Sequence, residues 1–231
     1  TDIHGAYAFV DLQPGKYQLR AQVGHDSVPM GVETVEVKPG RPIRGMDYRL
    51  APFKAGGWKQ YTMEHGLPSN EALAIFAAPD GMIWVGTTAG IARFDGDRFA
   101  HFTTEQGLLD DTVRSVFRDR DGFMWFGSTK GVSRLNLAAN RDRFERFPLD
   151  LTDPQDGIRS IIQTPDGRIW VAGSRGLAWF DGQIFHACEV SGGPKNPNRI
   201  TLGGDGLLWI TSKDGGLWSF DGRLFNKAEL G

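Results

Sequence analysis

The sequence predicts an all-β protein, and three observations support this prediction. Tryptophan recurs at positions 84, 125, 170 and 209, each time four residues after an aspartate and inside an apolar run. Glycine accounts for 31 of the 231 residues, an excess that favours many tight turns. No window between the turn signals shows sustained helical periodicity, so no helix longer than about two turns is expected.

Each copy of the repeat contains four short apolar or aromatic runs separated by Asp-Gly and Gly turn signals, which predict four strands, a to d. The tryptophan strands are apolar at consecutive positions, as in "IWV" and "MWF", so both faces must be covered. Stacked four-stranded blades of a β-propeller provide this cover at a period near 40. Residues 58–231 are therefore predicted to form four blades with four equivalent, largely buried indoles: Trp84, Trp125, Trp170 and Trp209.

The predicted array opens with a strand d that has no strands a to c of its own. "WKQYTMEHGL" from residue 58 aligns without a gap to "FAHFTTEQGL" from residue 99. The first segment is therefore expected to close a ring, and the resulting strand count predicts further blades after Gly231. We then expect an open arc, with residues 58–62 loosely placed and an apolar outer face on blade 4 that favours self-association. The alternative is a closed four-blade ring in which this segment pairs near residues 217–220.

Residues 1–50 show a different pattern. Apolar side chains alternate at Tyr7 and Phe9 and again from Tyr17 and Leu19, around the turn "LQPG", which predicts a hairpin of two half-buried strands. Two more strands are expected near "VETVEV" and "IRGMDYRL". These residues are interpreted as part of a small β-sandwich, and residues 51–57 as a linker.

Two family resemblances follow from these motifs. "YTMEHGLPSNEALAIFAAPDGMIWVGTTAGIARFDG" resembles the two-component regulator propeller repeat, over residues 58–231. "TDIHGAYAFVDLQPGKYQLRA" is similar to the later half of a carboxypeptidase regulatory-like domain, a prealbumin-like β-sandwich, over residues 1–50. The first resemblance implies a ring of about seven blades. It also implies a non-catalytic, periplasmic or extracellular-facing input region of a two-component-type signalling protein, with its output module outside this chain.

Composition and motifs exclude several other functions. With 26 basic and 28 acidic side chains, the chain carries no electrostatic signature of nucleic-acid binding. No apolar run reaches the roughly 18 residues that a membrane span needs. Neither the scattered histidines nor the single Cys188 shows metal-ligand spacing, so no metal or cofactor is predicted. The aspartates of the Asp-Gly pairs are interpreted as turn residues, not calcium ligands: Asp80, Asp121, Asp166 and Asp205.

An enzyme remains an alternative, because streptogramin lyase-like proteins are built from similar short repeats. His65 and His101 would be the first catalytic candidates, although the simpler explanation is a solvated side chain for each, His65 in a surface loop and His101 in an outer strand.

A binding surface is better supported. Antiparallel pairing within a blade places the b-to-c turns and the d-to-a loops on one face, where charged turn residues vary between copies. The candidate ligand-binding residues are Lys130, Arg175 and Lys213 in the turns, with Asn70, Asp111, Asp156 and Asn198 at the start of strand a. The ligand would be a small extracellular molecule, a saccharide included, or a protein partner; a purely structural interaction scaffold is the alternative. Trp179 and Trp218 are assigned one equivalent position in strand c. We expect them to pack between blades, in which case they carry no information on a ligand; exposure in a groove would instead favour stacking on sugar rings.

Overall fold

The computed structural model describes residues 14–19, 33–38, 59–137, 143–151 and 156–228. The chain divides into two units, residues 1–59 and residues 60–231. In the first unit, β1 (Gly15–Leu19) pairs antiparallel with β2 (Glu33–Val37). These are two of the strands predicted for the partial sandwich. The strand around Tyr7, the one near residues 43–50 and the linker at residues 51–57 lie outside the described residues.

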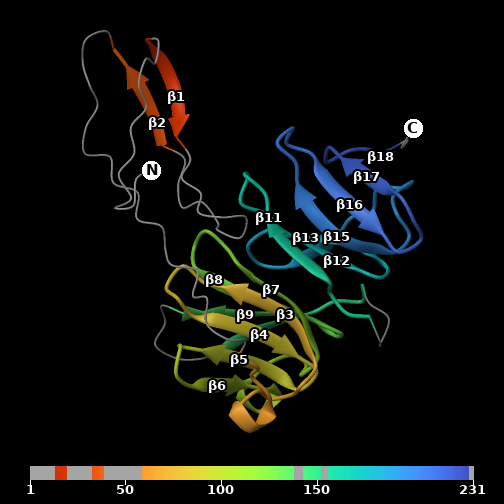
Figure 1. The fold of residues 1–231 in the computed structure, drawn as a ribbon. Helices are drawn as coiled ribbons and strands as arrows, with labels where there is room; N and C mark the ends of the chain where they lie inside the picture. Colours follow the sequence, from red (N-terminus) through yellow and green to blue (C-terminus); the bar gives the residue numbers. More distant parts are fainter. Residues whose placement is uncertain (1–13, 20–32, 39–58, 138–142, 152–155, 229–231) are drawn as a thin grey trace. The chain divides into compact units, whose positions relative to one another are not determined.

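The second unit contains four antiparallel sheets of four strands, and each sheet is built from four consecutive strands of the chain (Figure 1). The all-β prediction and the four blades are confirmed, since the helices whose bounds lie within the described residues are three-residue 3-10 turns, η1 (Met63–His65) and η2 (Thr104–Gln106). Blade 1 has β3 (Ala72–Ala77), β4 (Ile83–Thr87), β5 (Gly90–Phe94) and β6 (Phe99–Phe102). Blade 2 has β7 (Val113–Arg118), β8 (Phe123–Ser128), β9 (Gly131–Asn136) and β10 (Phe144–Pro148). Blade 3 has β11 (Ser160–Gln163), β12 (Ile169–Gly173), β13 (Gly176–Phe180) and β14 (Phe185–Ala187). Blade 4 has β15 (Pro197–Leu202), β16 (Leu208–Ser212), β17 (Leu217–Phe220) and β18 (Phe225–Lys227).

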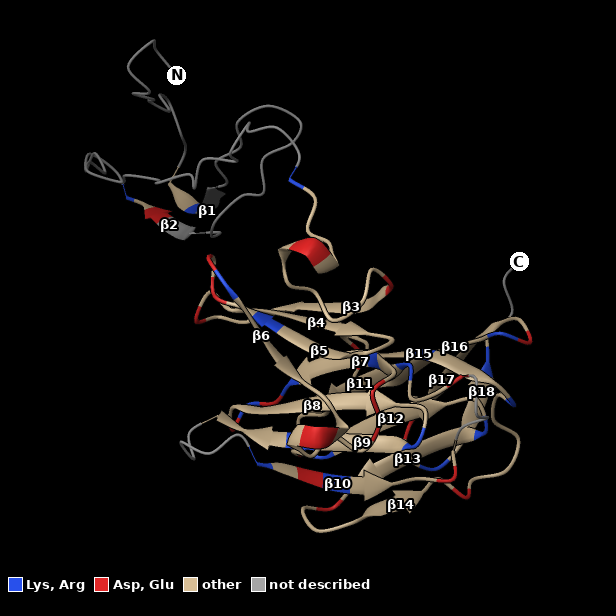
Figure 2. Ribbon diagram, turned by 90° about the horizontal axis from the view of Figure 1, so that it is seen from below, with Lys and Arg blue, Asp and Glu red and all other residues tan. Residues whose placement is uncertain are grey.

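Strand a is the inner strand of each blade, because the first strands of neighbouring blades contact one another: β3 with β7, β7 with β11, and β11 with β15. Charged residues lie mainly in the turns and loops, while most residues of the strands are uncharged (Figure 2). This distribution is expected of sheets that are covered on both faces by their neighbours.

The repeated tryptophans fill the spaces between blades. Trp84, Trp125 and Trp170 are 0%, 1% and 6% exposed, and each belongs to the apolar cluster between its own blade and the next. Their burial is confirmed. Trp209 holds the same position in β16 but is only half-buried, because no following blade covers it among the described residues. Trp209 is therefore the most exposed of the four indoles, although it stays partly buried.

The outer face of blade 4 is less apolar than expected. One cross-strand row on that face contains Thr201, Trp209, Ser219 and Asn226. Trp209 is the only large apolar side chain of this row. The prediction of an apolar outer face on blade 4 is thus wrong for this row.

Residues 59–62, which precede η1, pack on blade 1 in the same way that strand d of one blade packs on the next blade. The ring of Tyr61 lies 5.6 Å from that of Phe99. The equivalent pairs at the next two blade boundaries, Phe102 with Phe144 and Phe147 with Phe185, are 5.8 and 5.7 Å apart. Residues 59–62 are not part of any strand, and Trp58 lies outside the described residues. A closing strand at residues 58–62 therefore remains a prediction.

The prediction that the two strand-c tryptophans, Trp179 and Trp218, occupy equivalent positions is wrong. Trp179 lies opposite Trp170, whereas Trp218 lies opposite Ile210 and Ser219 takes the place opposite Trp209. The turn before β17 is one residue longer, with Gly215 and Gly216 both at positive φ. This insertion shifts the register by one residue and turns Trp218 to the other face of its sheet.

Candidate functional site

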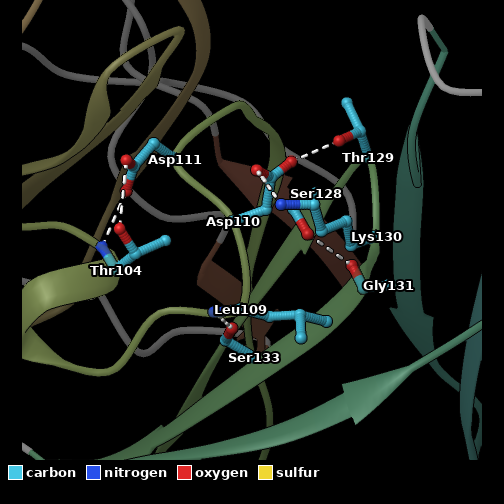
Figure 3. A network of polar contacts seen from close by, with 9 residues as sticks. All are labelled: Thr104, Leu109, Asp110, Asp111, Ser128, Thr129, Lys130, Gly131 and Ser133. Atoms are coloured by element: carbon cyan, nitrogen blue, oxygen red, sulfur yellow. Dashed lines mark hydrogen bonds and ion pairs between the residues drawn. The ribbon is translucent and has the colours of Figure 1, made fainter.

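The candidate site is the face that carries the d-to-a loops and the b-to-c turns, and Figure 3 shows its best-defined part. The loop between blades 1 and 2 is built around η2. The Thr103 hydroxyl accepts a hydrogen bond from the amide of Glu105, and the Thr103 amide donates to the side chain of Gln106 at 2.8 Å. Gly107, at φ 106°, ends this turn in a conformation that favours glycine.

Asn70 and Asp111 perform the same task in successive loops. The side-chain oxygen of Asn70 accepts a hydrogen bond from the amide of Met63 at 2.9 Å. Asp111 accepts from the amide of Thr104 at 2.7 Å and from its hydroxyl at 3.2 Å (Figure 3). Both side chains thus reach back seven residues and fix the 3-10 turn, so their main contacts are structural.

Lys130 lies at the b-to-c turn of blade 2, with its side chain 66% exposed. Its ammonium group is 3.4 Å from a carboxylate oxygen of Asp110, and the hydroxyl of Thr129 donates to the other oxygen of Asp110 (Figure 3). The loop backbone is held in turn by the amide of Leu109, which donates to the hydroxyl of Ser133 at 3.0 Å. Asp110 therefore joins the loop to the turn.

Two further cations pair with carboxylates on this face. Arg175, at the turn of blade 3, is 2.6 Å from Asp150, and both side chains are half or more exposed. Lys213, at the turn of blade 4, is 2.9 Å from Asp156, which also pairs with Arg159. The hydrogen bond from Lys213, followed by that from Arg159, lowers the pKa of Asp156 below its ordinary value.

Asn198 does not join the other candidates. It stands at the irregularity in the pairing of β15 with β16, where the register shifts between Pro197 and Arg199. Arg159 is the residue of blade 3 that matches Asn198, because it precedes Trp170 by eleven residues as Asn198 precedes Trp209. Its guanidinium donates hydrogen bonds to the side chain of Asn196 at 2.9 Å and to the carbonyl of Pro197 at 3.1 Å. Sequence reasoning missed Asp110, Asp150 and Arg159 as members of this network, although the first two are acidic residues of the d-to-a loops.

We call the three cation–carboxylate pairs of this face the charged rim; they are Lys130–Asp110, Arg175–Asp150 and Lys213–Asp156. Each pair offers hydrogen-bond donors and acceptors at a partly exposed surface. In the described part of the chain, no three His, Cys, Asp or Glu side chains are grouped to hold a metal ion. Nor does any helix there have the length and apolar character to cross a bilayer.

The histidine candidates for catalysis both contact the first loop. The Nδ1 atom of His65 accepts a hydrogen bond from the amide of Thr62 at 3.2 Å. The Nε2 atom of His101 hydrogen-bonds to the carbonyl of Gly66. These contacts position residues 62–66 on blade 1.

Trp179 is half-buried and its ring is already in contact with protein groups. The guanidinium of Arg168 lies 4.3 Å from the ring centroid, and His186 stacks on the ring at 4.6 Å. Trp218 packs against the core between blades 3 and 4. Neither indole therefore presents a plain open platform for a sugar ring.

Comparison with known families finds one match. The family described as the two component regulator propeller matches residues 66–89, 107–130 and 152–175. Each matched segment runs from a d-to-a loop to the b-to-c turn of blade 1, 2 or 3. The chain therefore contains two-component regulator propeller repeats. No curated protein sequence matches the chain.

Solved structures with similar coordinates are propellers. A virginiamycin B lyase from Staphylococcus aureus has a TM-score of 0.58 at 18% identity, covering 69% of this chain and 56% of that chain. The extracellular domain of a hybrid two component system from B. thetaiotaomicron has a TM-score of 0.58 at 20% identity, covering 68% of this chain and 22% of that one. A second such domain from B. thetaiotaomicron has a TM-score of 0.58 at 16% identity, covering 94% of this chain and 30% of that one. The chain thus spans about half or less of these proteins, and the likeness shows the propeller fold.

Proposed function

We propose that this propeller is a non-catalytic recognition module in the extracytoplasmic, periplasmic or extracellular-facing input region of a two-component-type signalling protein. The two-component regulator propeller repeats support this role, as does the likeness to extracellular domains of hybrid two component systems. The ligand would bind at the charged rim. The observation that carries the proposal is the recurrence, in three successive blades, of a half-exposed or exposed cation at the b-to-c turn beside a carboxylate.

The energetics of the rim favour recognition over a role in folding. Exposed ion pairs contribute about 0–1 kcal/mol to stability, and salt weakens them further. The fold is held instead by the apolar clusters between the blades. A small polar ligand can reach the cations of these pairs, which are 66%, 49% and 46% exposed, and exchange hydrogen bonds with them at little cost to the fold. A saccharide fits this chemistry, because its hydroxyl groups both donate to carboxylates and accept from ammonium or guanidinium groups.

Catalysis is not part of the proposal. The lyase neighbours share the propeller fold at 18% to 20% identity. His65 and His101 are engaged with the loop at residues 62–66. An interaction scaffold is the alternative function for the same rim, since a surface of mixed charge can also bind a protein partner with a complementary charged surface.

A thermal-shift screen of oligosaccharides tests the proposal. A ligand that binds only the folded state at 100 times its Kd stabilises the protein by about 2.7 kcal/mol, a readily measured shift. We expect Lys130→Ala and Lys213→Ala to reduce the shift. Arg98→Ala is the matched control, because Arg98 is an 86% exposed cation on a c-to-d turn at the other end of its blade. Equal loss of the shift in all three variants would contradict binding at the rim, and capture of a protein partner through the rim would favour the scaffold.

A further inference from the structure

A pocket of about 470 Å³ lies at the opposite end of blades 2 and 3, away from the charged rim. It is formed by the a-to-b turns of both blades and by the c-to-d turn of blade 3. Its lining combines Asp119, Phe123, Arg134, Gln163, Arg168 and Phe180. The proposed recognition at the rim does not use this pocket.

Asp119 is a buried carboxylate whose hydrogen bonds come from neutral groups alone. It is 9% exposed. One oxygen accepts from the amide of Phe123 at 2.8 Å, and the other accepts from the indole nitrogen of Trp125 at 2.7 Å. Each carboxylate oxygen has room for a second donor. Among the described residues no cation forms an ion pair with Asp119, so a buried negative charge faces the pocket without a direct counterion.

Asp121 adds a second carboxylate at the edge of the pocket. At the equivalent positions of the other blades, the aspartate side chain accepts from the amide two residues ahead, as Asp80 does from Met82 at 3.1 Å. In blade 2 that amide, on Phe123, donates to Asp119 instead. Asp121 lies in its turn as predicted, before Gly122 at positive φ, but its side chain has no hydrogen bond or ion pair within the described ranges.

The cations of the pocket already have partners. Arg134 is 2.5 Å from Glu145, and its guanidinium lies 4.7 Å from the ring of Phe123 and 5.1 Å from that of Phe180. Arg168 lies 3.6 Å from Asp166.

The other charged groups near the pocket are also accounted for. Asp181 hydrogen-bonds to His186 at 2.7 Å, and Arg120 donates to the carbonyl of Pro165 at 3.3 Å. Asp119 and Asp121 are thus the two carboxylates of the pocket that neither an arginine nor a histidine of the described residues pairs with directly.

We propose that this pocket is a second ligand site, and that it binds a small organic cation with a primary ammonium group on an apolar body. The ammonium donates to Asp119 and is attracted by Asp121, while the apolar body packs against the edges of Phe123 and Phe180. A calcium ion is a poor occupant, because it needs six to eight oxygen ligands. A charge-assisted bond to a buried carboxylate, by contrast, is among the stronger hydrogen bonds.

Benzylamine and benzyl alcohol are matched probes, since they share a ring and differ in charge. The readout is the indole N–H resonance of Trp125 in a ¹⁵N–¹H NMR spectrum, because this group donates directly to Asp119. We expect a saturable shift of this resonance with benzylamine and none with benzyl alcohol. A shift with both probes, or with neither, would overturn the proposal.

Three substitutions complete the experiment. Asp119→Asn keeps an oxygen acceptor for Trp125, and we expect it to weaken benzylamine binding about tenfold or more. Asp121→Asn, at an exposed position, should weaken benzylamine binding by a smaller factor. If Asp119→Asn does not fold, the effect of Asp121→Asn on binding tests the proposal by itself. Asp97→Asn is the charge-matched control on an exposed turn of blade 1 and should leave binding unchanged.

Binding that survives both pocket substitutions refutes the proposal. Lys130→Ala should not affect the binding of benzylamine. The test of ligand binding at this pocket is therefore independent of the test of recognition at the charged rim.

Discussion

Replacing Trp84 and Trp125 by phenylalanine, one at a time, isolates a single hydrogen bond within blade 2, from the Trp125 indole to Asp119. The two indoles occupy the same position in successive repeats and are 0% and 1% exposed. The Trp125 indole donates to Asp119 at 2.7 Å. Ala78 stands where blade 2 has Asp119, and the Trp84 indole nitrogen has no hydrogen-bond partner in the described structure.

The magnitudes follow from this difference. Each substitution removes a similar ring volume from a packed apolar cluster, so the loss of packing energy should be similar in the two variants. Trp125→Phe also removes a hydrogen bond to an ionised acceptor, which contributes about 1.5–3 kcal/mol. Trp84→Phe removes a buried donor without a partner, which returns part of the packing loss. We expect Trp125→Phe to lower the free energy of unfolding by at least about 1.5 kcal/mol more than Trp84→Phe does.

Urea denaturation followed by circular dichroism measures both free energies, with equal m-values as the condition for comparing them. A double-mutant cycle with Asp119→Ala should recover the same energy as the coupling between Asp119 and Trp125. The Trp84→Phe and Asp119→Ala effects should add. Equal losses for the two tryptophans, or a coupling energy near zero, would refute the role assigned to this hydrogen bond.

Three further predictions concern packing, pH and the half-buried cation Arg134. Gly127→Ala should destabilise the protein by about 1–3 kcal/mol, because a Cβ there would lie 2.8 Å from a carbonyl oxygen of blade 3. Gly204→Ala, whose Cβ meets nothing within 4 Å, should change little in the same denaturation assay. The pKa of Asp156 is lowered in the folded protein, so its contribution to stability is present at neutral pH and is lost as the pH falls below about 3.9; the stability difference between wild type and Asp156→Asn should shrink in that range. Arg134→Met should cost about 1–2 kcal/mol of stability by removing the cation from its aromatic surroundings, and an unchanged denaturation midpoint would contradict this.

The blades could be predicted because their causes are local and repeated. Asp-Gly turns, apolar runs and evenly spaced tryptophans specify strands and period without knowledge of distant contacts. Register was less predictable: the extra residue at Gly215 and Gly216 reverses the face of Trp218, although the neighbouring motif looks unchanged. A one-residue change in a turn is hard to see in sequence and turns a side chain to the opposite face.

The candidate site was predicted less completely than the fold. The sequence placed Lys130 and Asp111 on the same face correctly, because that follows from antiparallel pairing alone. It did not show that Asp111 and Asn70 hold the 3-10 turns, because those bonds depend on loop conformation. The same limit applies to Asp119, which replaces Asp121 as the acceptor in its turn.

Hydrogen exchange of the backbone amides, with and without the saccharide that gives the largest thermal shift, tests the proposed recognition at the charged rim most directly. Binding there predicts slower exchange at residues 108–112 and 128–131, which form the loop and turn around Asp110 and Lys130. Exchange at residues 119–123 and 163–168, at the other end of the blades, should not change. Protection confined to residues 119–123 and 163–168, or no protection anywhere in the propeller, would contradict the assignment of the rim as the recognition surface.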